Sequence, residues 1–288
     1  MSLLRFERNG LVALGSLDGE EVVDLSAVNP DLPTDISALL RLGPAAMEPV
    51  AAALRAAPAG ARVPLADVTV LPPTMTPGKT LCLGLNYVDH AAESGREKPD
   101  YPVVFMRCPT SFVGYGQPML RPKVSEQLDF EGELVAFVGR RGRHVPRDKA
   151  HDIIAGYSVF NDGSVRDYQR RTQQWTMGKN FDATGGFGPA FVAADQLPPG
   201  AKGLKIQTRL NGQVVQDANT SDMVFDLAET ISLLSACMTL EPGDLLVMGT
   251  PAGVGAARKP PLWMKPGDTC EVEIEGIGCL RNPIVQED

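Results

Sequence analysis

The sequence predicts an α+β protein in which short strands and turns stand beside a few helices. Of its 288 residues, 29 are Gly and 24 are Pro, which is high for a mainly helical protein. Residues 11–14 and 21–25 are apolar runs on either side of Asp18-Gly19, a pattern typical of a β-hairpin. Between residues 35 and 57 the apolar side chains recur at helical spacing instead.

Composition indicates a globular protein and disfavours two kinds of partner. Hydrophobic residues make up 43% and charged residues 22% of the chain, and the formal net charge is -8. An acidic chain without a long basic cluster is not expected to bind nucleic acid or an anionic membrane surface. The N-terminus lacks the apolar core of a signal peptide, and no stretch approaches the length of a membrane span, so we expect a cytoplasmic protein.

A Pro-rich connector divides the predicted elements into two parts. The helical stretch is interrupted near Gly43-Pro44, so we expect two short helices there. Residues 72–78 read PPTMTPG, a composition typical of a boundary between domains. We therefore predict a small N-terminal α+β domain at residues 1–71, a linker at 72–79 and a larger domain at 80–288.

Residues 129–138, DFEGELVAFV, predict a strand with two carboxylates on one face. Because strand side chains alternate with period two, Glu131 and Glu133 point the same way. Two such carboxylates repel each other unless a cation lies between them, and a hard divalent ion is the common solution. Asp162, at the end of a second apolar run, is placed to be a third ligand. The alternative for the pair is an ordinary solvent-facing strand.

A second candidate site follows the apolar strand predicted at residues 80–85. The helix expected after it places His90 and Glu93 three residues apart on one face. A carboxylate beside an imidazole can orient the ring and raise its basicity, as required to activate water. The alternative is a surface pair without a role.

Several polar side chains lie in the predicted loops between these stretches. Arg107 follows a strand at residues 101–105, and Arg166 and Gln169 lie in a loop or helix start at 161–169. Lys179 lies in a long Gly-rich loop at 174–189, and loops of this length are often functional. The alternative is that Lys179 is a solvated loop cation without a role in the site.

The last third of the chain predicts a helix, a strand and a Gly-rich turn. The helix spans residues 221–238, with Ser221 or Asp222 as its N-cap. A strand at 245–248 leads into residues 249–255, which lack the G-K-[ST] ending and the strict G-x-G-x-x-G pattern of nucleotide-binding loops. Such a backbone-lined loop could hold a small carboxylate instead. The chain ends in a β segment that continues to Ile284.

In their order and spacing, these stretches resemble the fumarylacetoacetate hydrolase superfamily over roughly residues 80–285. The resemblance is carried by residues 84–93, 129–133, 161–169, 178–182 and 249–255. It implies a mixed, rolled β-sheet catalytic domain with one Mg²⁺ or Mn²⁺ ion, in a homodimer. Gly163 and Arg107 depart from the family pattern, so the shape and charge of the outer pocket are not given by it.

Matched position by position, the resemblance implies a role for each candidate residue. The metal ligands would be Glu131, Glu133 and Asp162. The catalytic residues would be His90, Glu93 and Lys179. Thr250 would bind the substrate carboxylate, with Arg107, Arg166 and Gln169 as further substrate-binding candidates.

This site predicts a metal-dependent hydrolase that cleaves a C–C bond in an acylpyruvate and releases pyruvate through a metal-bound enolate. His90, oriented by Glu93, would activate the water, and Lys179 would stabilise the developing oxyanion. The same enolate also serves oxaloacetate decarboxylation and isomerisation or hydration of related oxo acids, which stay open as alternatives. A protein that only binds a dicarboxylate is a third hypothesis, which the base beside the metal disfavours.

Overall fold

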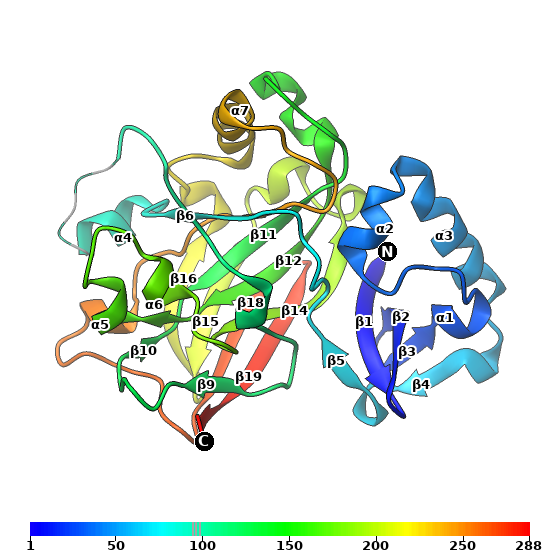
Figure 1. Ribbon diagram of the computed structural model, residues 1–288, viewed down its shortest axis with the longest axis horizontal. Coiled ribbons are helices and arrows are strands. Elements are labelled where there is room, and N and C mark those ends of the chain that lie inside the picture. The colour runs from blue at the N-terminus through cyan, green and yellow to red at the C-terminus, as the bar shows by residue number, and fades with distance from the viewer. Residues whose placement is uncertain (94, 96, 98) are drawn as a thin grey trace.

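The computed structural model describes residues 1–93, 95, 97 and 99–288. Their mixed α+β fold is built on a large sheet that contains both parallel and antiparallel pairs (Figure 1). Across this sheet the strands are β4 (Arg62–Pro64), β3 (Glu21–Asp24), β2 (Leu11–Asp18), β1 (Ser2–Arg8), β14 (Gly185–Ala193), β12 (Ile154–Asp162), β11 (Gly132–Val138), β17 (Leu245–Val247), β6 (Thr80–Gly84) and β7 (Val103–Met106). In addition, β5 (Thr69–Leu71) pairs with β1, and β8 (Phe112–Val113) pairs with β14.

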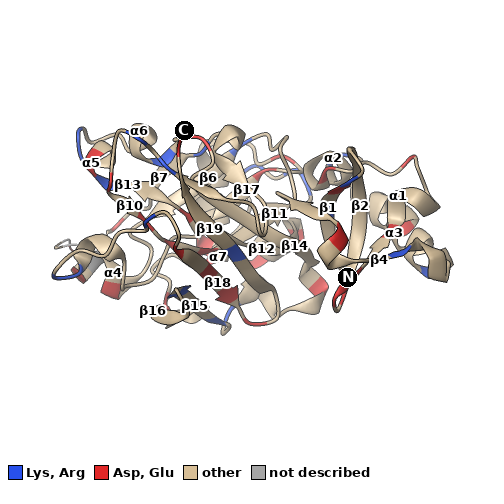
Figure 2. Ribbon diagram, turned by 90° about the horizontal axis from the view of Figure 1, so that it is seen from below, with Lys and Arg blue, Asp and Glu red and all other residues tan. Residues whose placement is uncertain are grey.

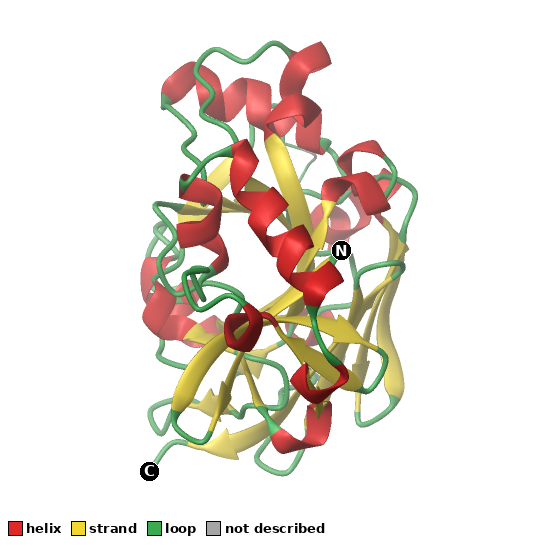
Figure 3. Cartoon of the chain, turned by 90° about the vertical axis from the view of Figure 1, so that its right-hand side faces the viewer, coloured by secondary structure: helices red, strands yellow, loops and turns green. Residues whose placement is uncertain are grey.

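The remaining strands form smaller sheets. One has the order β16 (Gln213–Asn219), β15 (Lys205–Leu210), β18 (Thr269–Ile274), β19 (Gly278–Gln286) and β9 (Met119–Arg121), and β10 (Leu128–Asp129) pairs with β13 (Ser164–Val165). The helices lie mainly around the outside of the strands (Figure 3). They are α1 (Leu25–Val28), α2 (Ile36–Arg41), α3 (Met47–Ala56), α4 (Val88–Glu93), α5 (Arg166–Gln169), α6 (Thr176–Lys179) and α7 (Leu227–Cys237).

Strand β11 is buried on both faces, which explains its unbroken apolar sequence. Leu134 and Ala136 belong to one core cluster, whereas Val135 and Phe137 belong to another. Successive side chains of a strand point to opposite faces, so each cluster covers one face of the sheet. The strand is therefore held rigidly from both sides.

The pairing of β11 with β12 positions the acidic residues. In the antiparallel register Gly132 lies opposite Asn161. The backbone N–H of Asp162 donates to the carbonyl of Glu131 at 2.8 Å. The end of β12 thus lies beside the start of β11, although the two segments are separated in the sequence.

The predicted N-terminal elements are present. Strands β2 and β3 form the expected antiparallel hairpin, and α2 and α3 are separated at Gly43, whose φ of 91° ends the first helical stretch. Strand β1 pairs with β14, with Leu3 opposite Phe191, so the N-terminal strands continue the main sheet. The division into domains at residues 72–79 stays a prediction.

The Gly-rich segment at residues 174–189 is not the continuous loop that the sequence predicted. Lys179 ends the short helix α6, and β14 begins at Gly185. The glycines here allow close packing rather than loop freedom. A Cβ on Gly185 would lie 2.9 Å from the Arg107 side chain, and one on Gly186 would lie 2.5 Å from Asn282 Oδ1.

Helix α7 begins later than predicted. Its N-cap is Asp226, whose side chain accepts the N–H of Glu229 at 2.9 Å. Ser221 and Asp222, the predicted caps, belong to a separate short 3₁₀ turn. The turn has its own cap at Asn219, which accepts the N–H of Ser221 at 2.9 Å. The polar residues before α7 therefore belong to two separate caps, and the sequence prediction assigned those of the turn to the helix.

Charge and helix length agree with the composition. Acidic and basic segments are interspersed along the ribbon (Figure 2). None of the helices in the described part of the chain is long and apolar enough to cross a membrane.

Candidate active site

Three carboxylates meet where β11 and β12 pair. Glu131, Glu133 and Asp162 are 5%, 1% and 0% exposed, and oxygen atoms from all three lie within 4.8 Å of one another. Asp162 is the last residue of β12, as expected of a strand-end ligand. Glu131, however, precedes β11. The strand predicted at residues 129–138 is thus interrupted at residues 130–131, but the two glutamates meet as expected, and the pairing of β11 with β12 brings Asp162 to them.

Glu133 forms no ion pair with the residues that the structure describes. Its Oε2 atom accepts the backbone N–H of Gly249 at 2.6 Å. Burial raises the pKa of Glu133 well above its usual range, and the negative charges of Asp162 and Glu131 raise it further. A cation between the three carboxylates would remove this repulsion. Because all candidate ligand atoms are oxygens, the cluster fits a hard divalent ion such as Mg²⁺ or Mn²⁺.

Lys179 is a buried cation between two of these carboxylates. Its Nζ atom donates to Glu131 Oε2 at 2.6 Å and to Asp162 Oδ2 at 2.5 Å. Burial alone would lower the pKa of Lys179, but the charges of Asp162 and Glu131 outweigh burial and raise it. The side chain is 1% exposed, so the alternative of a solvated loop cation is wrong. Two of its three N–H donors are engaged by carboxylates.

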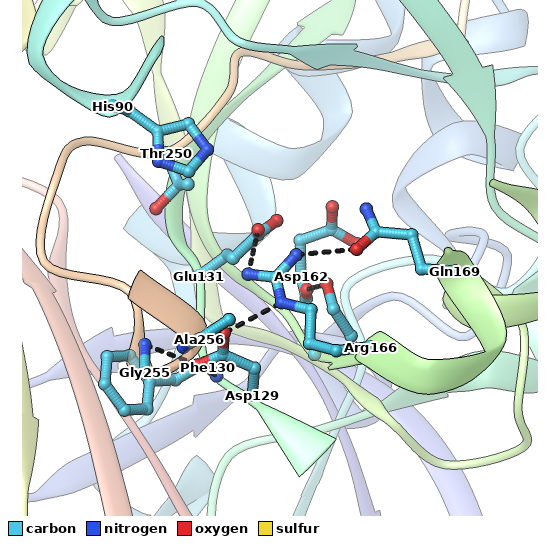
Figure 4. A network of polar contacts seen from close by, with 12 residues as sticks. His90, Asp129, Phe130, Glu131, Asp162, Arg166, Gln169, Thr250, Gly255 and Ala256 are labelled. Atoms are coloured by element: carbon cyan, nitrogen blue, oxygen red, sulfur yellow. Dashed lines mark hydrogen bonds and ion pairs between the residues drawn. The ribbon is translucent and has the colours of Figure 1, made fainter. Parts of the chain in front are cut away.

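Arg166 connects the acidic cluster to a fourth carboxylate, that of Asp129 (Figure 4). Its Nε atom donates to Asp129 Oδ2 at 2.8 Å, and Nη2 donates to Glu131 Oε1 at 2.6 Å. Burial would raise the pKa of Glu131, but the positive charges of Arg166 and Lys179 hold it well below its usual range. Arg166 Nη1 donates to Gln169 Oε1 at 2.9 Å, so the carbonyl oxygen of Gln169 is engaged and its amide N–H₂ group can donate to another partner.

The expected position of Arg107 in the outer pocket is wrong. The side chain is 2% exposed and donates to Asp162 Oδ1 at 2.5 Å and to the Gly163 carbonyl at 3.0 Å. Ser111 and Thr184 accept its other hydrogen bonds. Arg107 therefore holds Asp162 from behind and does not line the cavity in front of it.

The buried charges nearly balance. Four carboxylates face three cations, which leaves one net negative charge, and a divalent ion would change the balance to one positive charge. Such a site favours an anionic ligand. The groups are Asp129, Glu131, Glu133 and Asp162 with Arg107, Arg166 and Lys179.

His90 and Glu93 form the predicted pair on α4. His90 Nδ1 lies 2.8 Å from Glu93 Oε1, and His90 is 7% exposed. In the neutral imidazole, a hydrogen on Nδ1 that donates to Glu93 leaves the lone pair on Nε2. The pairing is confirmed, and the catalytic role of the two residues stays a prediction.

The Gly-rich loop after β17 donates its backbone N–H groups to carboxylates of the protein. Glu133 Oε2 accepts from Gly249 at 2.6 Å, Glu93 Oε2 from Gly253 at 2.8 Å, and the two oxygens of Asp129 accept from Gly255 at 2.7 Å and Ala256 at 2.9 Å. The sequence predicted that such groups face a small carboxylate. The four N–H groups instead bind carboxylates of the protein itself: Glu133, a candidate metal ligand; Glu93, which pairs with His90; and Asp129, which pairs with Arg166.

The Thr250 hydroxyl is also engaged within the protein. It donates to the Gly132 carbonyl at 3.0 Å and accepts from Gln216 Nε2 at 2.8 Å. The hydroxyl would have to break its hydrogen bond to the Gly132 carbonyl before it could donate to a substrate carboxylate. Thr250 nevertheless lines the cavity, so a role in substrate binding stays a prediction.

A cavity of about 680 Å³ opens in front of the acidic cluster. Eight of the predicted site residues line it, namely His90, Glu93, Glu131, Glu133, Arg166, Gln169, Lys179 and Thr250. Its wall also includes residues that the sequence did not single out, among them Phe105, Arg170, Trp175 and Val254. The pair, the acidic cluster and the Gly-rich loop therefore share one chamber.

Two residues that organise this site were missed. Asp129 opens the D-F-E-G-E stretch, so its spacing of two from Glu131 was a signal that could have been used. Gln216, which is 1% exposed, accepts from the Gly132 N–H at 3.0 Å and donates to Thr250. Its place in β16 gives no local sequence signal.

Known proteins resemble the chain in sequence and in structure. Residues 79–285 match the family model described as fumarylacetoacetate (FAA) hydrolase, C-terminal. The mitochondrial oxaloacetate tautomerase of Rattus norvegicus is 38% identical over 290 residues, which cover 99% of this chain and 92% of that protein.

Similar solved structures include two that align with the whole of this chain over their own whole length. The fumarylacetoacetate hydrolase from psychrophilic Exiguobacterium antarcticum is 32% identical, with a TM-score of 0.85. The maleylpyruvate hydrolase from Sphingobium sp. SYK-6, solved with a manganese(II) ion and pyruvate, is 28% identical, with a TM-score of 0.81. The chain belongs to the fumarylacetoacetate hydrolase family, whose members are enzymes.

Proposed function

We propose that this protein is a divalent-metal-dependent enzyme that interconverts the enol and keto forms of oxaloacetate. The observation that carries the proposal is the His90–Glu93 pair on the wall of the cavity that also exposes Glu131 and Glu133. Tautomerisation requires a base that moves a proton between C3 and the C2 oxygen of the substrate. The 38% identity with an oxaloacetate tautomerase over nearly the whole chain supports this reaction.

Glu131, Glu133 and Asp162 would hold the divalent cation. When bound there, Mg²⁺ or Mn²⁺ acts as a Lewis acid that polarises the C2 carbonyl of a 2-oxo acid and makes the C3 proton more acidic. Ion pairs with the buried cations hold the carboxylates of Glu131 and Asp162 in place. This arrangement spares the ligands a reorganisation when substrate binds.

His90 Nε2 would accept the C3 proton, and Glu93 would stabilise the imidazolium that forms. General-base assistance of this kind contributes ~10²–10⁴-fold in rate. The free N–H groups of Gln169 and Lys179 would donate to the oxygen on which negative charge develops. Return of the proton to that oxygen completes the interconversion without loss or gain of atoms.

A second candidate is hydrolysis of the C–C bond of an acylpyruvate, with release of pyruvate. His90 would then take a proton from water, which attacks the distal carbonyl. This reaction is favoured by the similarity to a maleylpyruvate hydrolase whose structure contains manganese and pyruvate. It needs the same base and the same cation, so only substrates separate the two functions.

The test uses the purified protein loaded with Mg²⁺ and two substrates. Enol oxaloacetate is followed by the decay of its ultraviolet absorbance, and an acylpyruvate is followed by pyruvate release. We expect faster tautomerisation, abolished by chelation and reduced about 10²–10⁴-fold in His90→Gln. The exposed His151 provides the matched control variant, His151→Gln. Pyruvate release without any effect on the enol would replace the first proposal by the second.

A further inference from the structure

Arg170 is a cation on the cavity wall whose guanidinium has no hydrogen-bond or ion-pair partner in the part of the chain that the structure describes. The other two strong cations on this wall are engaged. Arg166 binds Asp129 and Glu131, and Lys179 binds Glu131 and Asp162. A second negative charge on the substrate could therefore form an ion pair with Arg170.

The position of Arg170 follows from α5. Its backbone N–H donates to the Arg166 carbonyl at 3.1 Å, and its own backbone keeps a helical conformation as the C-cap. Side chains four residues apart on a helical turn lie on the same face, with roughly 5–6 Å between their Cβ atoms. Arg166 is 5% exposed and contacts the acidic cluster (Figure 4), whereas Arg170 is exposed. Arg170 thus lies one turn nearer to solvent.

The charge of the site requires two cations for a dicarboxylate. The four buried carboxylates, the three cations that pair with them and a divalent ion would together carry one positive charge, which matches the carboxylate next to the 2-oxo group. We propose that Arg170 binds the distal carboxylate, so that the enzyme selects 2-oxo dicarboxylic acids over monocarboxylic ones. Arginine suits this role because its planar fork binds a carboxylate through two parallel N–H bonds. The inference rests on the proposed function of the same cavity.

The neighbouring Arg171 offers a matched control. Its guanidinium carbon lies 3.7 Å from the centre of the Tyr168 ring, and Arg171 does not line the cavity. Arg170→Gln and Arg171→Gln remove the same charge from adjacent positions on the surface. A general electrostatic effect would appear in both variants, whereas a direct contact with the substrate would appear only in the first.

The first experiment compares oxaloacetate with its 4-methyl ester, which keeps the 2-oxo acid and removes the distal charge. We expect the wild type to prefer the acid in kcat/KM by roughly 10-fold to 100-fold, Arg170→Gln to lose this preference, and Arg171→Gln to keep it. Arg170→Lys should recover part of it. An equal loss for acid and ester in Arg170→Gln would overturn the proposal.

A second experiment does not depend on turnover. Calorimetry on the Mg²⁺-loaded protein compares binding of malate with binding of its 4-methyl ester. Tighter binding of malate that is lost in Arg170→Gln supports the inference even if oxaloacetate is not turned over, and only the proposed function would then fall. Tautomerase activity combined with equal affinities for malate and its ester in the wild type would overturn the inference alone.

Discussion

Glu93 accepts the backbone N–H of Gly253 at 2.8 Å, so the loop that follows β17 fixes the carboxylate that orients His90. The same loop holds Glu133 through Gly249 and Asp129 through Gly255. A displacement of this loop would therefore disturb the candidate base and a candidate metal ligand together. This coupling explains why the backbone of the Gly-rich loop is part of the site.

The first prediction concerns the pair on α4. Glu93→Gln should lower kcat roughly 10-fold to 100-fold, with a smaller change in KM, because the amide cannot stabilise an imidazolium as a carboxylate does. Steady-state kinetics on oxaloacetate checks this. The control is Asp89→Asn, which removes an exposed charge from the same helix and should leave kcat unchanged. Equal losses in the two variants would assign the effect to the charge of the helix.

A second prediction separates two candidate ligands by the sign of their effect on stability. Glu133 has no ion pair among the described residues, and its pKa is raised by burial and by neighbouring carboxylates. A neutral glutamine relieves this repulsion, so Glu133→Gln should lose at least about 10-fold to 100-fold in Mg²⁺ affinity without lowering the unfolding free energy of the metal-free protein. Calorimetric titration and urea unfolding measure the two quantities.

Glu131→Gln should weaken metal binding too, but it should also destabilise the metal-free protein. It breaks the buried ion pairs with Arg166 and Lys179, a loss worth about 3–5 kcal/mol when one partner of a buried pair is removed. Glu126→Gln, at an exposed position, serves as the control for both variants. Metal affinity that is unchanged in either ligand variant would refute the assignment of that residue.

Thr250→Val tests whether the hydroxyl serves the fold or the substrate. In the structure the hydroxyl bonds Gly132 and Gln216, so its removal should cost about 1–3 kcal/mol of unfolding free energy and leave KM unchanged. Urea unfolding and steady-state kinetics are the measurements. A KM raised by one to two powers of ten at unchanged stability would mean that the hydroxyl turns to the substrate carboxylate.

Asp35 fastens the segment at residues 72–79 to α2. Its carboxylate accepts from the hydroxyls of Thr74 and Thr76 at 2.8 and 2.9 Å and from the Met75 N–H at 2.8 Å, and it caps α2 through Ala38. Asp35→Ala should cost about 2–4 kcal/mol, since a lost cap and unsatisfied donors add. Asp24→Ala, at a cap with one exposed bond, should cost about 1 kcal/mol.

The pH dependence of this effect has a definite sign. Burial would raise the pKa of Asp35, but the hydrogen bonds from Met75, Thr74 and Ala38 lower it below its ordinary value of 3.8. A lowered pKa contributes stability above the unfolded value, and this contribution disappears as the pH falls through the folded value. The stability difference between wild type and Asp35→Ala should therefore shrink below about pH 4. A difference that grows on acidification would contradict the assignment.

Local sequence patterns determined much of the framework of this protein. The period-two and helical spacings, the Asp-Gly turn and the strand-end position of Asp162 need only neighbouring residues, so their physical signal is contained in short windows. The spacing of His90 and Glu93 likewise predicted that they are neighbours on one face of a helix. The order of the five site stretches indicated the family, and with it the mixed sheet.

Only the tertiary structure shows which partners the buried charged side chains have. Asp162 meets Glu131 and Glu133 because β11 and β12 pair in one register. Arg107 lies behind Asp162 because a long side chain reaches a partner that is distant in the sequence. The N–H groups of residues 249–256 bind Glu133, Glu93 and Asp129, which only the packed sheets bring near. A buried charge is stabilised by an oppositely charged or hydrogen-bonding partner. In this site most of these partners are distant in the sequence, so a local sequence pattern cannot identify them.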